Sequence, residues 1–240
     1  MYQYAYLLGV LVLGVIWLTI FLKRKDLRHE QLFMSFLTAP LAPITQILWF
    51  YHDYWRPEYF YKFYINNIPI GIEEVLFGFF VGGIGSVLYE FIRDRKHRLG
   101  KKKHLIAIIG ASVAVIIFLG LKYSGLNTIW SSTGGLILSA VILVILNRKL
   151  EFDFIWSGMA MLFIAIVSYA GLMALYPDLI ARSWVSDGLS GNQLLNIPIE
   201  ELAWFLAWGA FSGIIYESWI NVKAYPTLAK VENKRRASPA

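Results

Sequence analysis

The sequence predicts an all-α integral membrane protein with seven transmembrane helices, arranged as two parallel three-helix repeats joined by a linker helix. Three observations support this fold class. The chain has 240 residues and is 58% hydrophobic but only 16% charged, whereas soluble domains average about 25% charged residues. Apolar stretches of spanning length recur along the chain, and one acidic motif occurs twice.

The apolar stretches define the expected helices. A transmembrane helix needs about 20 predominantly apolar residues. Seven such stretches occur, at 3–22, 31–51, 68–92, 104–122, 125–146, 154–176 and 195–220. The first differs from a signal peptide because "MYQYAY" has no basic residue and the positive charges follow the apolar run.

The placement of Lys and Arg predicts the orientation. Under a seven-span arrangement, all but four of the 22 Lys and Arg residues fall on one side; the exceptions are Arg56, Lys62, Lys122 and Arg182. Because cytoplasmic loops carry the excess of basic residues, we expect the N-terminus outside and the C-terminus in the cytoplasm. We expect the plasma membrane of a prokaryote. The net charge of +6 is then a topogenic signal, and nucleic-acid binding is not expected.

Several kinds of chemistry are excluded by composition and motif. The chain contains no Cys, which excludes disulfides and thiolate chemistry. It contains no G-x-G-x-x-G fingerprint, no P-loop and no Cys/His metal cluster. The sequence therefore predicts neither a cofactor nor a bound metal.

An internal repeat is the most specific feature. Residues 67–74 read "NIPIGIEE" and residues 196–201 read "NIPIEE". Aligning Glu74 with Glu201 also aligns four further pairs at a constant offset: Glu73 with Glu200, Gly82 with Gly209, Tyr89 with Tyr216, and Glu90 with Glu217. A repeat of such specific residues indicates duplicated structural units.

The repeat predicts the domain boundaries. Residues 1–95 form the first three-helix unit, 96–123 the linker helix, 124–222 the second three-helix unit and 223–240 a basic cytoplasmic tail. With one span between them, the two units run in the same direction and are related by an axis along the membrane normal. Small residues in 68–92 and 195–220 predict that these two helices pack face to face.

The paired glutamates are the candidate catalytic residues. Pro69 and Pro198 suit a first helical position, and acidic residues in the first turn complement the helix dipole. The alternative is that the acids only occupy a helix N-terminus at the membrane interface and have no catalytic role. Placing an ionisable group in a membrane span, however, costs about 2.5–3.5 kcal/mol of insertion free energy. The helix dipole offsets only about 0.3–1 kcal/mol of this cost. Carboxyls sharing one cavity cannot all ionise, which suits paired acid and base work.

The two glutamates of each pair should have different partners, because adjacent helical residues point about 100° apart. We expect one glutamate toward the cavity and the other toward a buried partner, with Asn67, Asn196, Arg56 and Arg182 as candidates. The extra Gly71-Ile72 in the first motif predicts a rotation of its glutamates by about 200° relative to Pro69.

Three further groups of residues also have structural or functional interpretations. Phe77, Phe80, Trp204, Phe205 and Trp208 follow the acids, either as ordinary packing aromatics or as a π-lined pocket that stabilises a cation. The aligned Tyr-Glu pairs 89–90 and 216–217 are expected to be interfacial anchors at the cytoplasmic boundary, with a catalytic role as the alternative. Pro40 and Pro43 predict a kinked or broken helix, with Gln46 facing inward.

These motifs carry a resemblance to a known family. The "NIPIEE" and "NIPIGIEE" segments resemble the P-x-E-E motif of the non-flavin lycopene cyclase domain, found in heterodimeric bacterial cyclases and fused archaeal and fungal forms. The stretch "WRPEYFYKFYINNIPIGIEEVLFGFF" (55–80) is similar to the family's aromatic-rich loop. The second motif departs by continuing "LAWFLAW" in place of the usual Phe-Phe pair.

The resemblance implies cyclisation of the linear ψ-ends of lycopene, or a related carotenoid, to β-rings without net redox change. It implies that Glu73, Glu74, Glu200 and Glu201 are catalytic. Asn67, Asn196 and the five aromatics named above would bind the substrate. The partners implied are a hydrophobic carotenoid or polyprenoid and the lipid bilayer; homo-oligomerisation is left open.

Three other function classes are compatible with the same residues. One is a small membrane transporter with a three-plus-one-plus-three helix arrangement and a site at the midplane. The others are a purely structural subunit and a diverged, non-catalytic paralogue. A seven-span retinal protein is excluded because 195–220 contains no Lys for a Schiff base.

Overall fold

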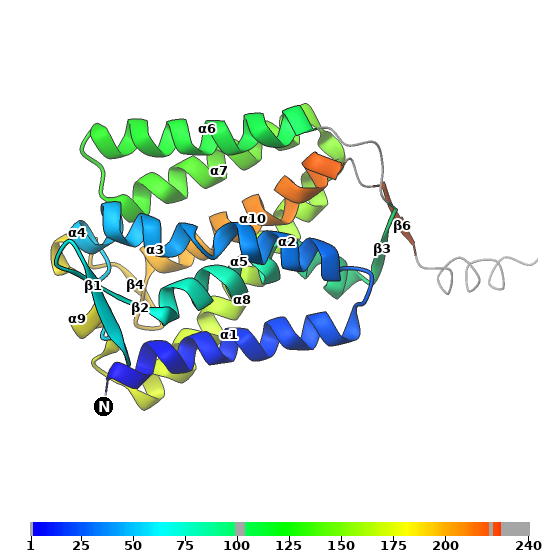
Figure 1. The fold of residues 1–240 in the computed structure, drawn as a ribbon. Helices are drawn as coiled ribbons and strands as arrows, with labels where there is room; N and C mark the ends of the chain where they lie inside the picture. Colours follow the sequence, from blue (N-terminus) through cyan, green and yellow to red (C-terminus); the bar gives the residue numbers. More distant parts are fainter. Residues whose placement is uncertain (1, 99–103, 221–222, 227–240) are drawn as a thin grey trace, which may run out of the picture.

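The computed structural model describes residues 2–98, 104–220 and 223–226. It is mostly helical, with long helices lying side by side (Figure 1). The α-helices are α1 (Gln3–Lys23), α2 (Arg28–Thr38), α3 (Leu41–Thr45), α4 (Tyr51–Asp53), α5 (Ile72–Arg93), α6 (His104–Tyr123), α7 (Thr128–Leu146), α8 (Glu151–Leu175), α9 (Leu179–Ser183) and α10 (Ile199–Ile220). The strands are β1 (Lys62–Ile65), β2 (Ile68–Gly71), β3 (Arg95–Arg98), β4 (Gln193–Leu194), β5 (Ile197–Pro198) and β6 (Lys223–Pro226).

Six helical segments of the described chain are long and apolar enough to cross a membrane. They are Gln3–Lys23, Arg28–Asp53, Ile72–Arg93, Leu105–Tyr123, Thr128–Leu146 and Arg148–Leu175. The seventh predicted span, 195–220, corresponds to α10, a helix of 22 residues that is not among these six. The structure therefore supports six candidate spans.

The second segment is interrupted where prolines were expected to interrupt it. Helix α2 ends at Thr38, α3 follows Pro40, and Gln46–Phe50 form a π-helical turn. Proline cannot donate the backbone hydrogen bond that a continuous helix needs. Gln46 is buried and its Nε2 donates to the Trp55 carbonyl oxygen at 2.9 Å, so the predicted inward orientation is confirmed.

Helices α5 and α10 pack against each other in the middle of the structure, as predicted. A side chain at Gly85 would collide with Ser212, so these two residues allow the close approach. Trp208 Nε1 of α10 donates to the Val81 carbonyl oxygen of α5 at 3.1 Å. Helix α5 also packs on α1 and α2, and α10 packs on α7 and α8.

The purely helical prediction is wrong at both ends of the helices, and at one end each acidic motif begins in a β-hairpin. Strand β1 pairs antiparallel with β2, and β4 pairs with β5. The connecting turns are Asn66-Asn67, with φ of 49° and 64°, and Leu195-Asn196, with φ of 55° and 63°. Two successive left-handed residues are typical of a type I′ hairpin turn. The Asn of "NIPI" is therefore a turn residue in both motifs.

The positions at which α5 and α10 begin contradict two further predictions. Pro69 lies in β2 and Pro198 in β5, so neither is the first helical residue. Helix α5 begins at Ile72 and α10 at Ile199, which places both glutamate pairs immediately after the first residue of their helices. The two extra residues of the first motif lengthen strand β2, which ends at Gly71, so the expected rotation of the first pair does not occur.

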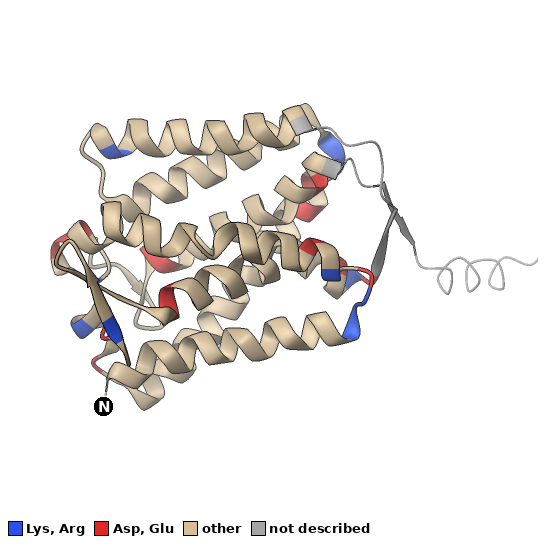
Figure 2. Cartoon of the chain, viewed as in Figure 1, with Lys and Arg blue, Asp and Glu red and all other residues tan. Residues whose placement is uncertain are grey.

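Hydrogen bonds also hold other segments of the chain together at the hairpin end. Asp53 Oδ2 accepts hydrogen bonds from Lys122 Nζ at 2.6 Å and from the Thr128 backbone N–H at 3.0 Å, which fixes the turn between α6 and α7 there. Tyr2 donates to Asp178 at 3.1 Å. Figure 2 shows acidic residues where α5 and α10 start at this end.

At the opposite end, β3 pairs antiparallel with β6. The first residues of the predicted tail thus form a strand. The rest of that tail, from residue 227, and the basic residues 101–103 lie outside the described residues.

Candidate active site

Glu74 is buried at the start of α5 and held by aromatic donors. Its Oε1 accepts hydrogen bonds from the Tyr59 hydroxyl at 2.8 Å and from Trp55 Nε1 at 3.2 Å. The hydroxyl of Tyr6 in α1 also interacts with this carboxyl group. We call Tyr6, Trp55 and Tyr59 the first cage.

Glu201 has the same kind of surroundings at the start of α10. Its Oε1 accepts from the Tyr54 hydroxyl at 2.8 Å and from Trp184 Nε1 at 3.0 Å. Its Oε2 accepts from the Tyr169 hydroxyl of α8 at 2.7 Å. We call Tyr54, Tyr169 and Trp184 the second cage. Each glutamate thus faces two tyrosines and one tryptophan.

The two cages adjoin each other. The rings of Trp55 and Trp184 have centroids 4.3 Å apart, and the two residues form an antiparallel β-bridge. Tyr54 belongs to the loop of the first unit but donates to Glu201 of the second. The site is therefore built from both sequence repeats together.

The loop tyrosines act as donors because they stay protonated. Burial, reinforced by the charge of Glu201, raises the pKa of Tyr54 well above the usual value for tyrosine. Burial and the charge of Glu74 do the same to the pKa of Tyr59. Both phenols are therefore neutral O–H donors at any physiological pH.

The first glutamate of each pair contacts a loop backbone instead. Glu73 Oε1 accepts the Phe60 backbone N–H at 2.8 Å, and Glu200 Oε1 accepts the Ser190 backbone N–H at 2.5 Å. Both side chains are completely buried. In each, Oε2 has no hydrogen-bond partner among the described residues. The two members of each pair therefore have different hydrogen-bond partners, and the predicted orientation of one of them toward a cavity stays a prediction.

The partners proposed from sequence for the buried glutamates are wrong. Asn67 and Asn196 lie in the hairpin turns with exposed side chains. Arg56 donates to the carbonyl oxygens of Tyr51 and His52. Arg182 lies over the Tyr2 ring and contacts Glu58. None of the four hydrogen-bonds to a paired glutamate.

Four of the five predicted aromatics gather one or two turns below the cages. Phe77 stacks on Trp204 with centroids 6.1 Å apart, and Trp204 stacks on Trp208 at 5.6 Å. Phe205 contacts both Phe77 and Trp204 edge-on. Phe77 also contacts Tyr6 of the first cage, so the aromatic group is continuous with the acid site.

Phe80 lies elsewhere. Its ring contacts Trp17 and Phe79 and faces Gly14 of α1. The structure places Phe80 in the packing between α1 and α5, away from the other four aromatics.

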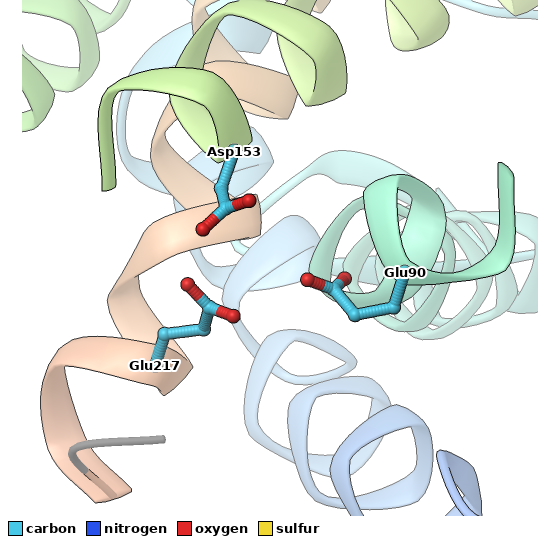
Figure 3. Close-up of side chains that lie close together, drawn as sticks. All are labelled: Glu90, Asp153 and Glu217. Atoms are coloured by element: carbon cyan, nitrogen blue, oxygen red, sulfur yellow. The ribbon is translucent and has the colours of Figure 1, made fainter. Parts of the chain in front are cut away.

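A second group of acids lies at the opposite end of the helices. Glu90, Asp153 and Glu217 come from α5, α8 and α10, and their nearest carboxylate oxygens all lie within 4.8 Å of one another (Figure 3). All three residues are buried, as are Tyr89 and Tyr216. The prediction that the aligned Tyr-Glu pairs are interfacial anchors is therefore wrong. Carboxylates this close are compatible only with shared protons or a counter-charge.

The cage residues were missed by sequence reasoning, although a signal for two of them exists. Trp55 and Trp184 lie the same number of residues before the Asn of their motifs. Extending the repeat upstream would have found them. Tyr6, Tyr59 and Tyr169 have no counterpart related by the repeat, and only the fold brings them to the acids.

These features define a class of protein. It is a helical bundle with membrane-length apolar helices whose buried carboxyl groups are surrounded by aromatic donors and π-faces. Such surroundings suit proton transfer to an apolar substrate and stabilisation of a cation.

The comparison with known families agrees with this class. The family model described as lycopene cyclase matches residues 3–92 and 127–219, which together make up more than half of the chain. The chain belongs to the lycopene cyclase family. The two matched segments contain both glutamate pairs. No curated protein and no solved structure matches the chain.

Proposed function

We propose that the protein is a membrane carotenoid cyclase that converts the linear ψ-ends of lycopene, or of a related carotenoid, to β-rings. Family membership supports a carotenoid cyclase and a hydrophobic substrate. The observation that carries the proposal is the pair of buried glutamates, Glu74 and Glu201, each held by two tyrosines and one tryptophan.

The proposed reaction is a gain and a loss of one proton. A carboxylic acid protonates the terminal double bond, which leaves a tertiary carbocation. The electron pair of the neighbouring double bond attacks this carbon and closes the ring, and the positive charge moves to the far end of that double bond. A carboxylate then removes an adjacent proton and a new double bond forms. No electron is gained or lost, so the proposal includes no cofactor.

Glu74 and Glu201 fit the acid and base roles because both are buried next to aromatic surfaces. General acid–base catalysis by a positioned side chain contributes about 10²- to 10⁴-fold. Phe77, Trp204, Phe205 and Trp208 would offer their π-faces to the cation. The exposed positions of Asn67 and Asn196 favour a turn role for them over substrate binding.

The membrane arrangement is part of the proposal. We propose seven spans, with α10 as the seventh, in two units at 1–95 and 124–222 around the linker helix α6. The cages would then lie at the outer side, because the four exceptional basic residues Arg56, Lys62, Lys122 and Arg182 belong to the segments at that end. The remaining Lys and Arg would face the cytoplasm.

A pigment assay in cells that accumulate lycopene tests this proposal. Cells expressing the protein should convert lycopene to products with β-rings. Glu74→Gln and Glu201→Gln should each abolish ring formation at unchanged expression, because an amide neither delivers nor removes the proton. Glu58→Gln is the matched control, since Glu58 is a half-exposed carboxylate in the same loop region. Unchanged lycopene with the wild-type protein would favour the non-catalytic paralogue.

The transporter alternative is not proposed. A transporter of this arrangement has its site at the midplane, whereas both cages lie where α5 and α10 begin.

A further inference from the structure

The two members of each glutamate pair touch different parts of the protein in both repeats. Glu74 and Glu201 accept hydrogen bonds from side chains of the cages. Glu73 and Glu200 accept hydrogen bonds from backbone N–H groups of loops. The same division occurs twice in one chain, at equivalent positions of α5 and α10.

The loops that Glu73 and Glu200 hold are the loops that supply the cages. Phe60, whose N–H binds Glu73, directly follows Tyr59, which donates to Glu74. The same loop contains Trp55 and Tyr54. Ser190, whose N–H binds Glu200, lies between Trp184 of the second cage and the β4–β5 hairpin.

Helix geometry makes this division necessary. Consecutive residues of an α-helix point about 100° apart. When the second glutamate of a pair points into its cage, the first one points away from it. Here it points toward the returning loop and accepts a backbone N–H of that loop in a partly buried hydrogen bond. A carboxylate is a strong acceptor for such a group.

We propose that Glu73 and Glu200 are positioning residues that fix the cage loops, while Glu74 and Glu201 exchange protons with the substrate. This inference rests on the proposed cyclase function. The positioning role needs a hydrogen-bond acceptor at the right place and does not need a proton. The catalytic role needs a carboxyl group. The two roles therefore differ in how they respond to an amide of the same shape.

The test compares Gln and Met at each position of the first pair, using purified protein and lycopene. Glu73→Gln keeps an acceptor oxygen for the Phe60 N–H and should retain at least about one third of the wild-type kcat. Glu73→Met keeps the side-chain length but removes the acceptor, and kcat should fall about 10- to 100-fold. Glu74→Gln should fall about 10²-fold or more. Rates are referred to monodisperse folded protein, so that a loss of yield is not read as a loss of catalysis.

Hydrogen exchange supplies a readout that does not depend on activity. In Glu73→Met, amide exchange in residues 54–61 should become faster than in the wild type. In Glu73→Gln and Glu74→Gln it should stay close to the wild-type rate. The corresponding Glu200 variants should show the same pattern in residues 184–192.

The outcomes separate this inference from the cyclase proposal. If wild-type protein forms no rings, the cyclase proposal fails, and the exchange experiment alone decides whether the loops are held by Glu73 and Glu200. If wild-type protein is active and Glu73→Gln is as inactive as Glu74→Gln, the positioning role is wrong and Glu73 takes part in proton transfer. Unchanged exchange in Glu73→Met would also overturn it.

Discussion

At the residue scale, Tyr54 connects the two sequence repeats at the site. It lies next to Trp55, which donates to Glu74, yet its own hydroxyl donates to Glu201. A hydrogen bond to a charged group is worth about 1.5–3 kcal/mol. The cage of the second unit is therefore incomplete without a residue from the first.

Removal of this donor is expected to slow catalysis. In Tyr54→Phe, Glu201 loses one of its three donors while the ring stays in place. The proposed reaction should slow by about 10- to 100-fold in kcat, with a smaller effect on KM. Steady-state kinetics with lycopene in detergent or nanodiscs measures both values.

The control for this variant is Tyr61→Phe, since Tyr61 is 71% exposed and precedes β1. Its kcat should match that of the wild type. If Tyr54→Phe also matches the wild type, the second cage does not contribute to the rate.

The sequence predicted the carboxylates but not the side chains around them. The paired glutamates stand out because charge at the start of an apolar helix is costly. Their donors lie 15 or more residues away along the chain; Tyr169, for example, reaches Glu201 from the C-terminal part of α8. Such contacts depend on which helices are neighbours, and the local sequence does not determine that.

At the element scale, the two hairpins set where the catalytic helices begin. The longer β1–β2 hairpin accommodates the two extra residues of the first motif, so α5 and α10 present their glutamates at the same helical positions. The rotation expected from the sequence assumed that the helix starts at the proline. Because proline lies in a strand in both motifs, the inserted residues lengthen the strand and leave the helix unchanged.

Replacing Leu195 by Asn is expected to stabilise the turn of the second hairpin. Leu195 adopts φ of 55°, whereas the first hairpin has Asn66 at the corresponding position. A left-handed conformation costs an ordinary residue about 1–2 kcal/mol, and Asn tolerates it better. Leu195→Asn should therefore raise the midpoint of thermal unfolding in detergent by about 2–4 °C.

The reciprocal variant is Asn66→Leu, which should lower that midpoint by a similar amount. If both changes leave the midpoint unaltered, the turn conformation does not limit the stability of the hairpins.

At the scale of the whole molecule, buried acids lie at both ends of the same helices. Helix α5 has Glu73 and Glu74 at one end and Glu90 at the other, and α10 has Glu200, Glu201 and Glu217. Glu30 interacts electrostatically with Glu90 and Asp153. Glu30 and Glu90 belong to the first sequence repeat, whereas Asp153 and Glu217 belong to the second. Residues of both repeats therefore contribute to the buried acids at each end of the helices.

The sequence predicted the long helices closely because their signal is composition over some 20 residues. The expected 104–122 corresponds to α6 at His104–Tyr123, and the expected 3–22 to α1 at Gln3–Lys23. The hairpins were missed because strands of two to four residues carry little periodicity, and their turns contain no glycine. The burial of Glu90 and Glu217 was missed because it depends on a third acid, Asp153, from another helix.

The most direct test of the proposed acid–base cyclisation is the reaction of purified protein with lycopene in D₂O, followed by mass spectrometry of the product. An enzyme acid that has exchanged with solvent delivers a deuteron, and the base removes a hydrogen from substrate carbon. The proposed acid–base cyclisation should place one non-exchangeable deuterium in the product for each ring formed, and Glu74→Gln and Glu201→Gln should give no product. Rings without deuterium, or lycopene recovered unchanged from the wild-type protein, would contradict it.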